Sequence, residues 1–184
     1  MVSMTSTQEI KTTGFALTEL LVAIVILGIL AIISLDSGLK MRRRDQINSL
    51  AVTLSGWIEE VRRSSQRGVG CTLTIGGTNL TAGSTFASSS PSTTSTTVTD
   101  LNACMKLDPL VIPGSFARNS GLFSIDTASF TFTPRGTVTY TSGSSVSIVI
   151  SQQNNPDKRC LRLNGLLGLL EISKGSSCGS QELF

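Results

Sequence analysis

An apolar run from Phe15 to Leu35 constrains this chain more than any other feature of the sequence. The run reads FALTELLVAIVILGILAIISL, and Glu19 is the only residue within it that carries a full charge at neutral pH. A helix needs about 20 mainly apolar residues, each rising about 1.5 Å, to cross the hydrocarbon core of a bilayer. We therefore expect residues 15–35 to form a helix that crosses a membrane.

The carboxylate of Glu19 needs a reason to lie in such a run. An ionised carboxylate at the middle of a membrane helix costs at least about 2.5 kcal/mol. Glu19 follows Phe15 by four residues, so the two lie on the same helix face. If the chain were cut before Phe15, the new ammonium group would lie beside this carboxylate. The pair could then form within one helix or between neighbouring helices.

The junction before this run carries a resemblance to a known family. Gly14-Phe15 followed by Thr18-Glu19-Leu20-Leu21-Val22 resembles the class III signal of type IV pilins and type II secretion pseudopilins. The resemblance implies that residues 1–14 are a leader, that a prepilin peptidase cuts between Gly14 and Phe15 and methylates the nitrogen of Phe15, and that Glu19 is the assembly glutamate. An ordinary single-pass anchor is the alternative. A removable secretory signal fits less well, because its apolar core has about 7–15 residues.

Near the end of the run, a proline common in pilins is missing, and a group of basic residues follows. Asp36 stands where many pilins have a proline, although Gly28 matches a glycine common in these helices. The bases Lys40, Arg42, Arg43 and Arg44 follow the run. By the positive-inside rule alone, these bases would place the rest of the chain in the cytoplasm. The cleavage signal and the cysteine count favour the opposite side, and the bases then form a solvated or headgroup-facing collar.

The helix is expected to continue through residues 36–67. Apolar residues recur there at steps of three and four, which draws one stripe on a helix. We expect one helix from Phe15 to about Gln66, ended by Gly68 and Gly70, with its second half packed on a β-sheet. The stripe consists of Ile47, Leu50, Leu54, Trp57, Ile58 and Val61.

Residues 68–184 change to a period of two, which predicts a β domain. Gly76-Gly77 is expected to form a turn after the first strand, and the Ser/Thr-rich residues 81–99 a low-complexity loop. The expected strands cover residues 71–75, 104–107, 110–112, 122–125, 129–133, 137–141, 146–151, 159–163 and 166–172.

This second half carries a narrower resemblance. The segment FTFTPRGTV, Phe130 to Val138, resembles the F-x-P-x-G hairpin of the GspH/FimT group of minor pilins and pseudopilins, and the helix end from Val61 to Gly68 resembles that group's matching segment. The resemblance implies an α+β pilin fold, with a long N-terminal helix on an antiparallel sheet. DNA-binding members of the group carry a Gly-Arg-x-Arg type of motif near the C-terminus. Here the corresponding stretch, Gly165 to Leu170, is apolar.

The four cysteines all follow the apolar run, and none forms a Cys-x-x-Cys pair. An even number in a domain expected outside the cytoplasm favours two disulfides. Three pairings are possible, and we prefer Cys71–Cys104 with Cys160–Cys178 because each closes a moderate loop. Four buried free thiols are the alternative.

Composition narrows the chemistry further. The chain has no histidine, which removes the commonest metal ligand and the usual general base near neutral pH. We expect no enzyme activity, no cofactor and no metal, and we interpret Asp126, Asp157 and Glu171 as surface or turn carboxylates. The bases Lys158, Arg159, Arg162 and Lys174 either line a DNA-contacting surface or belong to a solvated sheet face.

We therefore expect a structural subunit of a type IV pilus or a type II secretion pseudopilus. Its expected partners are a prepilin peptidase, the inner membrane and other pilin or pseudopilin subunits. It would cross the inner membrane once before assembly and then form part of a periplasmic or cell-surface filament. The alternatives are a DNA-binding minor pilin for natural transformation, a major pilin for attachment or motility, and a plain membrane-anchored domain.

Overall fold

The structure is a computed structural model of the 184-residue chain. It describes residues 17–67, 70–92, 104, 107–118 and 122–175, with the backbone alone for residues 31–37 and 117–118. The chain divides into two compact units, Met1–Leu39 and Lys40–Phe184.

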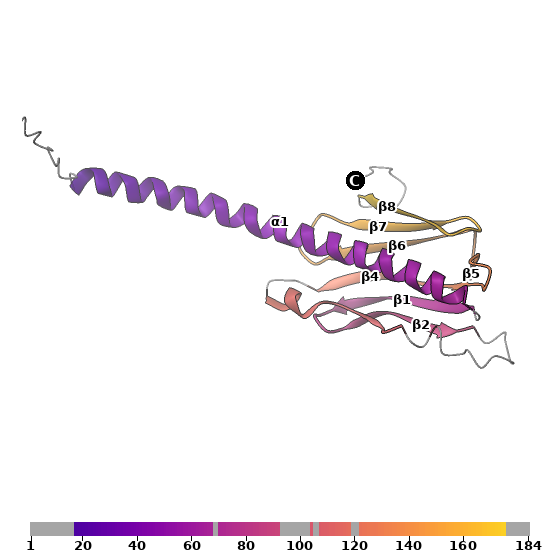
Figure 1. The fold of residues 1–184 in the computed structure, drawn as a ribbon. Coiled ribbons are helices and arrows are strands. Elements are labelled where there is room, and N and C mark those ends of the chain that lie inside the picture. The colour runs from indigo at the N-terminus through magenta and orange to yellow at the C-terminus, as the bar shows by residue number, and fades with distance from the viewer. Residues whose placement is uncertain (1–16, 68–69, 93–103, 105–106, 119–121, 176–184) are drawn as a thin grey trace, which may run out of the picture. The chain divides into compact units, whose positions relative to one another are not determined.

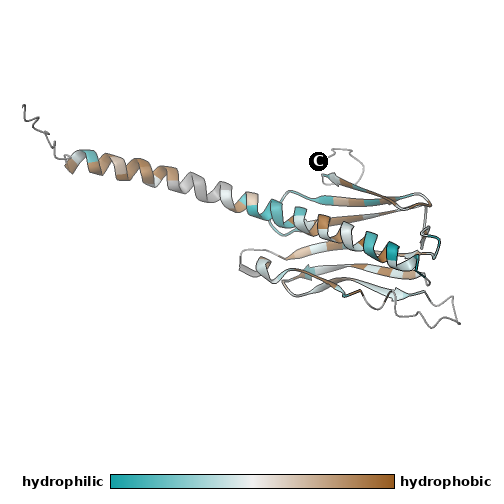
Figure 2. Ribbon diagram, in the orientation of Figure 1, coloured by the Kyte–Doolittle hydropathy of each residue, from teal (hydrophilic) through white to brown (hydrophobic). Residues whose placement is uncertain are grey.

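The helix α1 spans Leu17–Ser65 and contains 49 residues. Its end matches the expected end near Gln66, while Phe15 lies outside the described residues. Apolar residues predominate along the first part of α1, and polar and apolar residues alternate along its second part (Figure 2). Over the described residues, no helix meets the length and hydropathy required of a membrane span. The expected span, residues 15–35, includes residues 15 and 16 and the side chains of residues 31–35, which are not described.

The eight strands form one antiparallel sheet in the order β3-β2-β1-β4-β6-β7-β8, with β5 paired to β4 (Figure 1). The expected α+β class, a helix with an antiparallel sheet, is therefore confirmed. A short 3-10 helix, η1, covers Gly114–Arg118. The strands are β1 Cys71–Leu80, β2 Thr85–Pro91, β3 Leu110–Val111, β4 Phe123–Phe132, β5 Val138–Tyr140, β6 Ser145–Gln152, β7 Arg159–Asn164 and β8 Leu169–Lys174.

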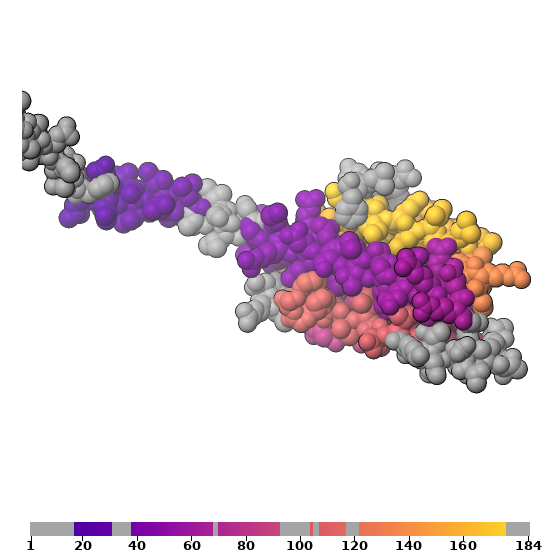
Figure 3. All heavy atoms as spheres, in the orientation of Figure 1, coloured from indigo at the N-terminus to yellow at the C-terminus, as the bar shows by residue number. Residues whose placement is uncertain are grey.

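The second half of α1 lies against one face of this sheet (Figures 1 and 3). The predicted stripe is buried, with Ile47, Leu54 and Val61 fully covered and Trp57 only 7% exposed. These side chains join one core with the inward residues of β1, β4, β6 and β7. The inward residues alternate with exposed ones, as the period of two predicted.

Hydrogen bonds fix α1 to the sheet at both ends of this contact. Near its start, Asn48 Oδ1 accepts a bond from Arg159 Nε at 2.6 Å. At its end, Ser65 Oγ donates to the Thr133 carbonyl at 3.3 Å. The polar bonds at the two ends therefore set the register in which the apolar stripe meets the strands.

Several expected strand limits were wrong. Gly76-Gly77 is no turn but a bulged part of β1, and residues 122–125 and 129–133 belong to the single strand β4. Residues 85–91, expected within a loop, form β2, whereas residues 93–99 of that loop lie outside the described part. The expected strand 104–107 is absent from the residues described there, because Cys104 is helical and Leu107 lies in a bend.

Candidate assembly site

The first part of α1, residues 17–30, is apolar on every side. Successive residues of a helix are turned by about 100°, so Leu20, Leu21 and Val22 already point in three directions. No polar stripe runs along this segment. Its large apolar side chains, each 52% to 83% exposed, are Leu17, Leu20, Leu21, Val22, Ile24, Val25, Ile26, Leu27, Ile29 and Leu30.

This exposure is too costly for a helix in water. Burying one Leu or Ile side chain stabilises a protein by about 1.5–3 kcal/mol relative to leaving it exposed. For ten such side chains, the sum is on the order of 10 kcal/mol or more, as large as the whole stability of a typical domain, about 5–15 kcal/mol. A helix that is apolar all round is normally buried in a core or a membrane. This segment, which we call the apolar segment (residues 17–30), therefore needs to be covered by apolar groups that the described residues do not supply.

Glu19 lies in the first turn of α1 as described, and its side chain is exposed. It is the only charged residue of the apolar segment. Gly14 and Phe15, the predicted cleavage and methylation positions, lie outside the described residues. The expected pair between the Phe15 ammonium group and Glu19 therefore stays a prediction.

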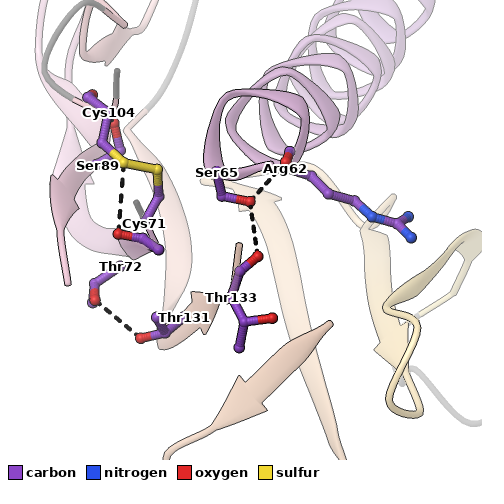
Figure 4. The surroundings of a disulfide bond; sticks show 9 residues. Arg62, Ser65, Cys71, Thr72, Ser89, Cys104, Thr131 and Thr133 are labelled. Atoms are coloured by element: carbon purple, nitrogen blue, oxygen red, sulfur yellow. Dashed lines mark hydrogen bonds between the residues drawn. A yellow bond between two sulfur atoms is a disulfide. The ribbon is translucent and has the colours of Figure 1, made fainter. Parts of the chain in front are cut away.

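The predicted disulfide Cys71–Cys104 is confirmed, with the two Cα atoms 5.7 Å apart. It joins the start of β1 to the segment that leads into β3 (Figure 4). Cys160 is also disulfide-bonded. Its expected partner, Cys178, lies outside the described residues.

Two further bonds fix the chain around Cys104 over the core. Ser89 Oγ in β2 donates to the Cys104 carbonyl at 2.9 Å (Figure 4). The indole Nε1 of Trp57 in α1 donates to the Asp108 carbonyl at 3.2 Å. The disulfide therefore belongs to a contact that ties α1, β1 and β2 together at one end of the domain.

The basic residues do not gather as the DNA alternative requires. Arg159 is only 2% exposed and faces α1, whereas Arg162, three residues later in the same strand, is exposed on the other face. Burial lowers the pKa of the Arg159 guanidinium, Arg44 lowers it further, and Asp157 opposes the shift. The hypothesis that Lys158, Arg159, Arg162 and Lys174 share one surface is therefore wrong for Arg159.

The collar residue Arg43 contacts the domain. Its Nη1 atom donates to the Asn154 carbonyl, in the turn between β6 and β7, at 3.3 Å. Its neighbours Arg42 and Arg44 are exposed. The collar thus has one member bound to the sheet domain and others directed to solvent.

The carboxylates that the structure describes do not cluster in a way that would suit metal binding. In the described part of the chain, no three His, Cys, Asp or Glu residues come close enough to hold an ion. Asp126 and Glu171 are exposed, and Asn164 Nδ2 donates to Glu171 Oε2 at 3.2 Å. Asp157 is half-buried and lies in the turn before β7.

Compared with known proteins, the chain matches no protein-family model, no curated protein and no solved structure.

Sequence reasoning missed the polar contacts beneath α1. Gln46 Oε1 accepts from Gln152 Nε2 at 3.2 Å, beside the Asn48–Arg159 bond. These contacts could have been predicted from the sequence, because Gln46 and Asn48 flank Ile47, the first residue of the apolar stripe. That placement left them at the border of the apolar stripe, where a polar side chain reaches a facing strand.

Proposed function

We propose that the chain is a structural subunit, a pilin or pseudopilin, of a type IV pilus or a type II secretion pseudopilus. The observation that carries the proposal is the apolar segment: residues 17–30 are exposed and apolar all round, and they contain one carboxylate. The same helix continues to Ser65, where its second half packs on an antiparallel sheet. The segment has the chemistry of a helix that passes from a bilayer into a bundle of like helices.

The inner membrane would cover the apolar segment first. A prepilin peptidase would remove residues 1–14 and methylate Phe15, and the segment would then move into a filament core formed by other subunits. A buried charge is tolerated where it is paired, and breaking such a pair is strongly destabilising. Glu19 would therefore pair with the Phe15 ammonium group and fix the register between neighbouring subunits.

Mass spectrometry of the mature protein tests the processing step. We expect the chain to begin at Phe15 and to be heavier by one methyl group. A mature chain that still begins at Met1 would contradict the proposal. A plain membrane-anchored domain would then be the better interpretation.

The Glu19→Gln variant tests the assembly step. It should be cleaved and methylated normally but enter sheared filaments poorly. Glu60→Gln is a matched control, because Glu60 is an exposed residue of the second half of α1. Normal incorporation of Glu19→Gln would show that the carboxylate does not set subunit register.

A further inference from the structure

The sheet face opposite α1 carries hydroxyl groups in register across four strands. Thr72 of β1 lies between Ser90 of β2 and Thr131 of β4, and Thr131 lies beside Thr139 of β5. Neighbouring strands are about 4.8 Å apart, so these four residues form a row across the sheet. Thr72 Oγ1 and Thr131 Oγ1 are hydrogen-bonded at 3.0 Å in the middle of the row (Figure 4).

A second row runs beside the first. Two residues further along each strand, Thr74 lies between Ser88 and Ser129, and Thr141 Oγ1 donates to the Ser129 carbonyl at 2.9 Å. Residues i and i+2 of a strand are about 6.7 Å apart and point to the same face. The two rows form what we call the hydroxyl face: residues 72, 74, 88, 90, 129, 131, 139 and 141.

The hydroxyl face is open to solvent and carries no charge. None of its eight residues is buried, and only Thr72 and Thr131 are half-buried. All eight are Ser or Thr. On the same side of the sheet, β7 and β8 instead place Arg162 opposite Glu171. The absence of ionisable and aromatic groups is therefore a property of these eight positions, since β4 also contains exposed Asp126 and β5 contains Tyr140.

We propose that the hydroxyl face binds a neutral polysaccharide. A Ser or Thr hydroxyl both donates and accepts a hydrogen bond, as a sugar hydroxyl does, so rows of one can pair with a chain of the other. A face without cations offers nothing to the phosphates of a nucleic acid, whose binding depends on Lys and Arg. Its lack of charge therefore matches an uncharged, hydroxyl-bearing polymer.

The same chemistry makes a single face a weak binder. Hydrogen bonds to a ligand replace bonds to water, so each contributes only a small net free energy, and no aromatic ring is present to stack on a sugar. Linked sites can exceed the affinity of one site by about 10²- to 10⁴-fold. Strong binding in the organism therefore rests on the proposed function, because a filament would repeat the hydroxyl face along its length.

The test displays the full-length chain densely on beads in detergent, through a tag after its last residue, so that multivalency does not depend on filament formation. Two labelled probes share one backbone: hydroxyethyl cellulose is neutral and carboxymethyl cellulose is anionic. We expect the beads to retain the neutral polymer and to do so equally at low and high salt.

The double variant Thr72→Val and Thr131→Val removes both members of the central hydroxyl pair and leaves no hydroxyl without its partner. Valine suits a strand, and an unchanged emission of Trp57 would confirm the fold. We expect at least a tenfold lower retention of the neutral polymer. The matched control, Ser49→Ala with Thr53→Val, removes two exposed hydroxyls from α1 and should change nothing.

Three results would overturn the inference: no retention of hydroxyethyl cellulose, equal retention by the central double variant, or retention of carboxymethyl cellulose alone at low salt. The last would point to the basic residues instead. None of these results bears on cleavage at Gly14 or on assembly through Glu19, so the two proposals can fail separately.

Discussion

Gly76 holds a position in β1 that a side chain cannot enter without moving the backbone. Its φ is +130°, and a Cβ atom there would lie 2.6 Å from the Cα atom of Thr127 in β4. Gly83 also has a positive φ, +86°, but nothing lies within 4 Å of its Cβ position. Strained backbone alone costs about 1–3 kcal/mol. We expect Gly76→Ala to lower the free energy of unfolding by more than that amount, and Gly83→Ala to stay within it.

Urea denaturation of the two variants measures the difference. The comparison separates backbone strain, which both variants carry, from the collision with β4, which only Gly76→Ala carries. Equal losses of stability would mean that β1 and β4 separate easily at the bulge.

Tyr140 gives a prediction on pH dependence. Its Oη donates to the Gly165 carbonyl at 2.9 Å, and burial raises its pKa above the ordinary value of 10.0. The folded state therefore holds the phenol proton more tightly than the unfolded state does. The resulting stability is complete below pH 10.0 and is lost as pH rises through the folded-state pKa.

Because Tyr140 is the only tyrosine, tyrosinate absorbance reports its titration directly. We expect a midpoint above 10.0, and a fall in stability at alkaline pH that is smaller in Tyr140→Phe. A midpoint at or below that value would contradict the burial of the phenol.

At the scale of elements, the disulfide Cys71–Cys104 closes a loop over a sequence separation of 33 residues. In the chain-entropy account, a loop of this length stabilises a domain by about 3–4 kcal/mol. Cys71→Ala with Cys104→Ala should lower the free energy of unfolding by about that amount. It should also loosen the Asp108 contact of Trp57 and shift its emission to longer wavelength.

Trp57 is the only tryptophan, so its emission reports this one contact. Unchanged emission in the double variant would show that the segment around Asp108 stays in place without the disulfide. The Ser89 bond to the Cys104 carbonyl would then be the stronger tether.

The elements that the sequence predicted best are those with a strong apolar period. The stripe from Ile47 to Val61 and the end of α1 depend on local spacing, and both were correct. β2 was missed because its residues, mostly Ser and Thr, bury only Phe86 and Ala87, and its formation depends on pairing with β1. The bulge at Gly76-Gly77 imitates a turn in sequence, since positive φ is common to both.

The candidate functional features also differ in whether local sequence is enough to predict them. The apolar segment and Glu19 are properties of local sequence, and so they could be found without the structure. The hydroxyl face combines strands whose register no local pattern reveals. Thr72 and Thr131 are 59 residues apart in the chain yet hydrogen-bonded. The alternation of Ser129 with Thr131 and of Thr139 with Thr141 was the available signal. It indicated a binding face only once β1 and β2 were placed beside these residues.

At the scale of the whole molecule, the boundary between the two units separates the exposed apolar segment from the domain that has its own buried core. The unit Met1–Leu39 contains the apolar segment, whereas Lys40–Phe184 contains the buried stripe of α1 and all eight strands. The core residues from Ile47 onward all belong to the second unit. The second unit should therefore hold its fold without the first, because every core residue that the structure describes lies after Lys40.

A chain that begins at Lys40 should be monomeric without detergent and should unfold in one cooperative transition, since it keeps the core and the Cys71–Cys104 disulfide. The full chain should require detergent or lipid, because the large apolar side chains of residues 17–30 are exposed in the part of the chain that the structure describes. Sedimentation with and without detergent compares the two chains. As a control for simple shortening, the full chain with Leu21→Lys and Ile24→Lys should need less detergent while keeping its length. Aggregation of the chain from Lys40 would show that the exposed leucines of the β7–β8 turn, Leu166 and Leu167, also need a cover.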